Sequence, residues 1–341
     1  MKITKILVAL SFLFAISTAQ AGELTVTGSM EATYHTQGDK TTGNPLGMDR
    51  ELKFSGSTEL DNGVTVSVMQ DTSDNLGYGN SQIMFGGVGG VVDIYVGSDS
   101  DPVDAIDDIT PSAYEEANGS GSGTYTSNDI GDKAGQMGIG FKANVPFLGA
   151  LNYKHYPRVD STKNADNASS GDANATTGSA YSASLKTNLA DLPVVGSFLD
   201  GATLTTGVAE TDHSQVANTD DAFDATAALN YSVGNFSLGV QKKVHNEGES
   251  GTSGTTDAVF YKDTVIGLAY AFNDNLSISW NDYESYKHDG IGSPNQETTA
   301  INVGYTVGGM TVGFQDASTD NDNYTADAKD DTRTLGVSVA F

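Results

Sequence analysis

The chain has 341 residues, with 44 acidic and 17 basic side chains, a formal charge of -27 and no cysteine. The absence of cysteine excludes disulfides, thiolate metal sites and cysteine nucleophiles, and the negative charge argues against nucleic acid as a partner, because phosphate binding requires clustered Lys and Arg. A hydrophobic content of 38% with so much net charge is typical of disorder, but 15 Tyr and 13 Phe indicate that something other than a thick protein core orders the chain.

The first residues have the layout of a secretory signal peptide. Lys2 and Lys5 precede an apolar run from Ile6 to Ile16, and Ala19-Gln20-Ala21 follows as a cleavage site of small residues. The run is too short for a membrane-spanning helix, and no later segment has about 18 consecutive apolar residues. We therefore predict a signal peptide over 1–21 and an exported mature chain over 22–341 without a membrane helix.

Alternation of apolar and polar residues recurs along the mature chain. It is clearest at the C-terminus, where Leu335, Val337, Val339 and Phe341 alternate with small or polar residues, and it recurs over 223–233 and 301–307. A period of two predicts β-strands with one apolar and one polar face, and helical spacing fits none of these stretches.

Sixteen strands are predicted from this pattern, at lengths typical of membrane barrels. They are placed at 23–34, 49–60, 64–70, 81–86, 91–98, 134–144, 150–157, 179–187, 203–210, 223–233, 236–244, 257–272, 276–286, 297–306, 310–317 and 332–341. Short turns rich in Gly, Asn and Asp alternate along the chain with long polar loops. Residues 188–202 fall where a short turn is expected but carry several apolar side chains, so a count of 18 strands stays open.

An even number of strands joined by alternating short and long connections indicates an outer-membrane barrel. The alternative is a soluble β-sandwich, but the polar face of these strands suits a water-filled lumen better than a second sheet. Aromatic residues at strand ends on the apolar face match interfacial girdles: Tyr231, Phe236, Tyr270, Phe272, Tyr305 and Phe341. We predict an all-β, closed, 16-stranded antiparallel transmembrane barrel, because an open edge in lipid would leave backbone groups unpaired.

Four segments resemble the Gram-negative general porins. They are residues 24–28, 51–63 and 92–97, and the C-terminal Phe341 with the alternating Val339, Val337 and Leu335. The resemblance implies a homotrimer in the outer-membrane lipid of a Gram-negative bacterium, with the third loop folded into each pore. It also implies that the C-terminal strand, from Leu335 to Phe341, is the signal read by the outer-membrane assembly machinery.

The loop over 98–132 follows the fifth strand and is the candidate pore constriction. Its acids precede the first basic residue, Lys133, and those assigned to the constriction are Asp99, Asp101, Asp104, Asp107, Asp108, Glu115 and Glu116. Porins of this kind carry a basic cluster on the opposite wall, but Glu51 and Ser55 stand here where Arg and Lys are common. The predicted pore wall is Glu51, Lys53, Lys142, Lys154 and Lys186, with Lys243 as a further candidate. Because fixed charge at a narrow point sets ion selectivity, we expect a preference for cations.

The expected function is passive diffusion of small hydrophilic solutes and ions through the barrel. A substrate-specific channel and an adhesin acting through external loops at 157–178 and 318–331 remain alternatives. No cofactor is expected, although Ca²⁺ at the acidic loop is an option because oxygen-rich clusters bind it. The five histidines have no metal-ligand spacing, and no nucleophile, base and orienting group can be identified, so we do not expect an enzyme.

Overall fold

The structure is a computed structural model that describes residues 24–38, 43–73, 77–99, 101–117, 130–131, 136–159, 178–193, 198–212, 220–246, 248, 259–288 and 292–341. The predicted signal peptide lies outside the described residues. No helix in the described part of the chain is long and apolar enough to cross a membrane.

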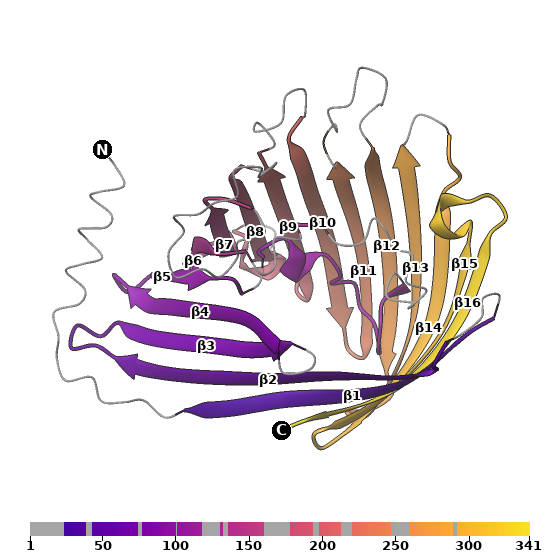
Figure 1. The fold of residues 1–341 in the computed structure, drawn as a ribbon, viewed down its shortest axis with the longest axis horizontal. Helices are drawn as coiled ribbons and strands as arrows, with labels where there is room; N and C mark the ends of the chain where they lie inside the picture. The colour runs from indigo at the N-terminus through magenta and orange to yellow at the C-terminus, as the bar shows by residue number, and fades with distance from the viewer. Residues whose placement is uncertain are drawn as a thin grey trace.

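Sixteen strands form one closed antiparallel barrel in which each strand pairs with its neighbours in sequence and β1 pairs with β16 (Figure 1). Their bounds are β1 Thr25–Gln37, β2 Leu46–Glu59, β3 Thr65–Ser73, β4 Gly77–Val88, β5 Val92–Gly97, β6 Gly138–Val145, β7 Gly149–Tyr156, β8 Ala180–Asn188, β9 Ala202–Thr211, β10 Ala222–Val233, β11 Phe236–Asn246, β12 Phe260–Ala271, β13 Leu276–His288, β14 Gln296–Val307, β15 Met310–Asp320 and β16 Lys329–Ala340. The predicted fold class and strand count are confirmed.

The segment that left 18 strands open forms no additional hairpin among its described residues. A short 3-10 turn, η5 (Leu189–Asp191), follows β8 and is capped by the side chain of Asn188, which accepts a hydrogen bond from the Ala190 amide. β8 pairs directly with β9 through Asn188 and Thr203. The described residues of this connection belong to a long turn, and the barrel has 16 strands.

The alternation seen in the sequence separates lipid-facing from lumen-facing side chains. On β14, Thr298, Ala300 and Asn302 are buried inside the barrel, whereas Ile301 and Tyr305 between and beyond them are exposed on the outside. Each strand of such a barrel needs only one apolar side, because the lumen side faces water. This accounts for the low hydrophobic content of an ordered chain.

Aromatic side chains project outwards at the end of the barrel that carries the short turns. Phe236 and Phe272 are more than half exposed, and Phe236 lies 4.6 Å from Tyr270 across strands β11 and β12, measured between ring centroids. Trp280, on β13, also faces outwards, 40% exposed. Rings in these positions are typical of the membrane interface.

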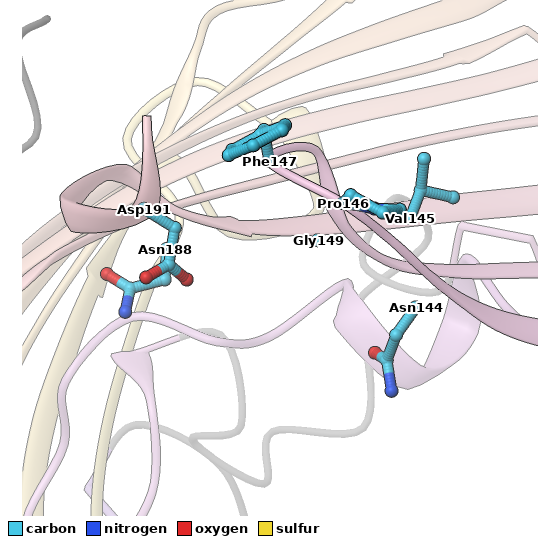
Figure 2. Close-up of a pocket in the computed structure, with 7 residues that line it drawn as sticks. All are labelled: Asn144, Val145, Pro146, Phe147, Gly149, Asn188 and Asp191. Atoms are coloured by element: carbon cyan, nitrogen blue, oxygen red, sulfur yellow. The ribbon is translucent and has the colours of Figure 1, made fainter. Parts of the chain in front are cut away.

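The β6–β7 turn and the β8–β9 connection lie side by side at the same end (Figure 2). Phe147, in the left-handed backbone region at φ 66°, is 64% exposed, and with Pro146, Asn188 and Asp191 it lines a cavity of about 400 Å³. The neighbouring strands β5 to β8 have only six to nine residues. The exposed apolar side chains of these turns extend the outward apolar surface of the barrel at the place where its strands are shortest.

Candidate functional site

After β5 the chain turns into the barrel and runs along its inner wall (Figure 1). This inner loop, residues 98–117 and the described part of its return at 130–131, includes the short 3-10 helix η3 (Asp104–Ile106). Its inward path is confirmed by hydrogen bonds to strands from β7 to β15 and to β1. The loop lies against one half of the lumen wall.

Asp101 anchors the beginning of the inner loop. Its carboxylate is fully buried and accepts hydrogen bonds from Tyr156 Oη at 2.7 Å on β7, from Ser182 Oγ on β8 and from the Val103 amide at 2.8 Å. Close by, Lys154 Nζ donates to the Asp99 carbonyl at 2.6 Å. A carboxylate with this many donors is held in one position.

Amide side chains of the wall bind the backbone of the middle of the loop. Gln241 Nε2 donates to the Ile106 carbonyl at 2.8 Å, and Asn230 Nδ2 to the Ile109 carbonyl at 2.8 Å. Asn281 Nδ2 donates to the Pro111 carbonyl at 3.1 Å. These side chains therefore supply the loop carbonyls with the hydrogen-bond donors that a neighbouring strand would supply in a sheet.

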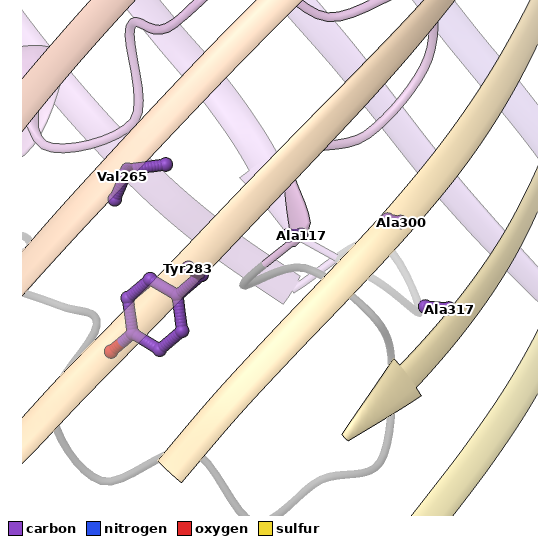
Figure 3. Close-up of a cluster of buried hydrophobic side chains, with 5 residues drawn as sticks. All are labelled: Ala117, Val265, Tyr283, Ala300 and Ala317. Atoms are coloured by element: carbon purple, nitrogen blue, oxygen red, sulfur yellow. The ribbon is translucent and has the colours of Figure 1, made fainter. Parts of the chain in front are cut away.

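The far end of the inner loop reaches β1. Tyr114 Oη donates to the Glu31 carboxylate at 2.7 Å, and Gln315 Nε2 on β15 donates to the Glu116 carbonyl at 3.1 Å. Glu116 turns back to accept from the Thr110 hydroxyl within the loop. Ala117 closes this end in a buried apolar cluster with Val265, Tyr283, Ala300 and Ala317 (Figure 3).

Burial divides the lumen into two halves. On β10 to β15, lumen-facing residues such as Gln241, Asn281 and Asn302 are fully buried; we call this the covered half. On β1 to β8, most lumen-facing charged residues stay accessible, with Glu51 and Lys186 exposed, whereas Lys154 on β7 is buried beneath the start of the loop; we call this the open half. The accessible surface of the lumen is therefore that of the open half and of the side of the loop that faces it.

A cavity of about 680 Å³ lies between the inner loop and the open half. Ala105 and Ile106 of η3 line one side of it. The opposite side comes from β5 to β8 and carries the charges of Asp93, Lys142 and Lys186. The lining is of mixed character, because apolar side chains such as Val91 and Leu151 lie beside these charged groups.

Comparisons with known proteins agree with this architecture. In sequence, no protein-family model and no curated protein matches the chain. Among solved structures, a porin refined at 1.8 Å matches at 12% identity and a TM-score of 0.63, over 94% of this chain and 100% of its own. Salmonella typhi OmpF in complex with daunomycin matches at 13% and 0.64, over 94% and 98%, and a mutant of Rh. blastica porin at 15% and 0.60, over 94% and 100%.

The chain has the general porin fold. In this porin fold the loop acids assigned from the sequence separate into two groups. Asp101, Asp107 and Glu116 are buried, whereas Asp108 and Glu115 are exposed. Asp99 and Asp104 are half-buried.

The wall residues assigned from the sequence also separate. Glu51, Lys142 and Lys186 are exposed on the open half, and Lys53 is half-buried beside its register partner Asp71. Two lysines assigned or considered for the wall, Lys154 and Lys243, are fully buried under the inner loop. In this position Lys154 holds the loop instead of meeting solutes.

Three lumen acids were missed by the sequence reasoning. Glu31 and Asp49 are register partners on β1 and β2, and Asp93 lines the cavity from β5. Together with Glu51, Glu31 and Asp49 form an acidic stretch of the wall on β1 and β2, and the charge of Glu31 acts on Glu115 at the end of the loop. Their lumen parity in the sequence is the signal that could have found them.

Glu115 and Glu116 titrate near neutral pH. Partial burial, followed by the nearby charges of Glu31 and Asp108, raises the pKa of Glu115 to about 7. Burial raises the pKa of Glu116 to about 7 as well, although the Thr110 hydroxyl and the charge of Lys243 oppose it. The loop charge thus depends on pH in the physiological range.

No group of three or more acidic or histidine side chains is placed to hold a metal ion in the part of the chain that the structure describes. Much of the acidic loop beyond Ala117 lies outside that part. The Ca²⁺ site considered at the acidic loop from Asp99 to Asp108 stays a prediction.

Proposed function

We propose that the chain is an outer-membrane porin, a water-filled channel for passive diffusion of small hydrophilic solutes and ions. The observation that carries the proposal is the inner loop seated on the covered half, which leaves a cavity of about 680 Å³ with charged side chains in its lining beside the open half. Solutes pass without tight binding or chemical change. The width left by the loop excludes large solutes.

Cation preference follows from the balance of charge around this passage. Glu31, Asp49 and Glu51 on the wall, with Asp108 and Glu115 on the loop, place five carboxylates beside the lumen. Lys142 and Lys186 line the cavity together with Asp93, and Lys53 is the third lysine accessible from the open half. Acids outnumber bases, and a ring of acidic side chains favours cations.

The aromatic residues favour a general channel over a sugar-specific one. A sugar track requires accessible rings along the path, but the lumen-facing Tyr95, Tyr156, Tyr261 and Tyr283 are buried. Within the described residues, these rings pack beneath the loop or against neighbouring strands. Their surface is not offered to a passing solute.

The cellular setting completes the proposal. Export by a cleaved signal peptide, residence in the outer membrane of a Gram-negative bacterium and assembly as a homotrimer fit the porin fold. Phe341 is 63% exposed at the end of β16, and Leu335, Val337 and Val339 face outwards with it. This apolar edge is the part of the chain that the assembly machinery would recognise.

Planar-bilayer recording of the purified protein tests the proposal. We expect stable single-channel openings that added sugars do not block, and a reversal potential of the sign for cation preference in a salt gradient. Absence of conductance from correctly folded protein would refute the channel. A reversal potential of the opposite sign would refute the preference alone.

A further inference from the structure

Six glycines on the lumen side of the barrel lie beneath the inner loop. They come from β9, β11, β12, β14, β15 and β16: Gly207, Gly239, Gly267, Gly304, Gly313 and Gly336. A Cβ added to any of them would lie closer than 3.0 Å to another atom, and the atoms met include Ile106, Pro111, Ala113 and Tyr114 of the loop. At Gly267 the obstacle is the Pro111 carbonyl oxygen at 2.6 Å.

Backbone conformation does not account for these glycines. None of the six has a positive φ, so any residue could adopt their backbone angles. Glycine in the middle of a strand weakens it by roughly 0.5 to 1 kcal/mol relative to Ala. The close approach of the loop is the property that only glycine permits.

Amide side chains stand two residues from three of these glycines, on the same face of the same strand. The pairs are Gly239 with Gln241, Asn302 with Gly304, and Gly313 with Gln315. Each glycine lets the loop backbone approach, and each amide supplies it with a hydrogen bond, as Gln241 does for Ile106, Asn302 for Glu115 and Gln315 for Glu116.

The pairing register places the glycines next to one another across strands. Gly239 pairs with Gly267, and Gly304, Gly313 and Gly336 form a continuous row. The first row meets Pro111 and the second meets Ala113 and Tyr114. Successive residues of the loop thus lie over successive glycine rows as the loop crosses the tilted strands.

We propose that these six glycines, with Gln241, Asn302 and Gln315, form a glycine–amide seat that positions the inner loop and thereby sets the width of the lumen. This inference rests on the proposed function, which it deepens. A methyl group at Gly267 needs an ordinary contact of 3.4 Å in place of 2.6 Å, which moves the Pro111 carbonyl by at least 0.8 Å. The displacement is directed away from the covered half, into the passage.

Engineered cysteines report the loop position without any ion flow. The chain has no cysteine, and the Ala113 amide lies 2.9 Å from Ser279 Oγ, so Ala113→Cys with Ser279→Cys places one thiol on the loop and one on the wall at this contact. Gly304→Ala is then added, because its Cβ meets the Ala113 carbonyl. Gly86→Ala is the matched control: this lumen-side glycine on β4 has no neighbour closer than 3.5 Å to an added Cβ.

We expect the parent pair and the Gly86→Ala variant to cross-link fully on mild oxidation, and the Gly304→Ala variant to lose most of its cross-link while keeping the heat-modifiable gel mobility of a folded barrel. Equal cross-linking of Gly304→Ala and Gly86→Ala would overturn the seat. Conductance of the Gly304→Ala channel without the cysteines should fall below that of Gly86→Ala.

A second variant keeps the proposal testable if the Gly304→Ala protein does not fold. The Cβ added by Gly313→Ala would clash with the ring of Tyr114, so the single substitution should lower the conductance. The conductance should return in the double variant with Tyr114→Ala, which lacks the ring. No rescue by Tyr114→Ala would count against the seat. If no variant and no parent conducts, the porin proposal fails, whereas the cross-linking result still decides the seat.

Discussion

Replacing Asp101 with Ala should destabilise the barrel and leave ion selectivity almost unchanged. Asp101 is an acid of the inner loop, but its carboxylate is 0% exposed and faces the wall instead of the passage. Its partners are Tyr156 and Ser182 on neighbouring strands and the amides of Val103 and Asp104. The substitution therefore tests whether Asp101, which the sequence assigns to ion selectivity, instead stabilises the folded barrel.

The size of the effect follows from the donors left behind. Hydrogen bonds to a charged group contribute roughly 1.5 to 3 kcal/mol each, and Asp101 accepts from two hydroxyls and two amides. Removing one partner of a buried charged network costs about 3 to 5 kcal/mol in total. Asn at this position keeps one acceptor oxygen, so Asp101→Asn should lose less.

The assay compares the temperature at which the folded barrel converts to the unfolded form on a detergent gel, since barrels of this kind are best ranked by their rate of unfolding. Asp108→Asn, an exposed acid of the same loop, is the matched control. We expect Asp101→Ala to lower the conversion temperature markedly, and Asp108→Asn to leave it unchanged but reduce cation preference. A reversal potential shifted more by Asp101→Asn than by Asp108→Asn would refute the reasoning.

Three further predictions concern charge, pH and assembly. Glu31→Gln should lower cation preference, and Lys186→Glu should raise it, because both side chains border the open half; equal reversal potentials in both variants would contradict this. Since the pKa of Glu115 is raised from 4.5 to about 7, its carboxyl is mostly neutral at pH 6 and charged at pH 8, so cation preference should increase over that range and Glu115→Gln should flatten the change. Phe341→Ala should reduce the amount of protein assembled in outer-membrane fractions, with Val307→Ala, another outward apolar residue beside a short turn, as the control; equal amounts would argue against the proposed assembly signal.

The barrel could be predicted from the sequence because apolar and polar residues alternate along each strand, and this alternation indicates which side chains face outwards. Alternation such as that of Ile301 to Val307 fixes both the strand and its lipid face, and every predicted strand has its counterpart. Strand ends were less certain: β6 was predicted from 134 but begins at Gly138, and β2 was predicted from 49 but begins at Leu46. At strand ends the polar residues of a loop and of a lumen face are alike.

The roles of the loop acids could not be predicted in the same way. A loop has no periodicity, so Asp101 and Asp108 are equivalent in sequence although one is buried and the other exposed. Lys154 has lumen parity, as predicted, but the loop covers it. Parity decides which side of the wall a residue faces, and only the path of the loop decides what lies over it.

The division of the lumen separates most of the residues that hold the inner loop from the charged residues that stay accessible. Gln241, Asn281 and Gln315 serve the loop and are closed to traffic, whereas Glu51, Lys142 and Lys186 carry no loop contact among the hydrogen bonds described. Glu51, Lys142 and Lys186 can therefore be exchanged without loss of a described hydrogen bond to the loop, unlike Glu31 and Lys154, which the loop contacts. A barrel built in this way can acquire a new ionic preference through few substitutions, and the same freedom makes the open half the place to engineer a sensor pore.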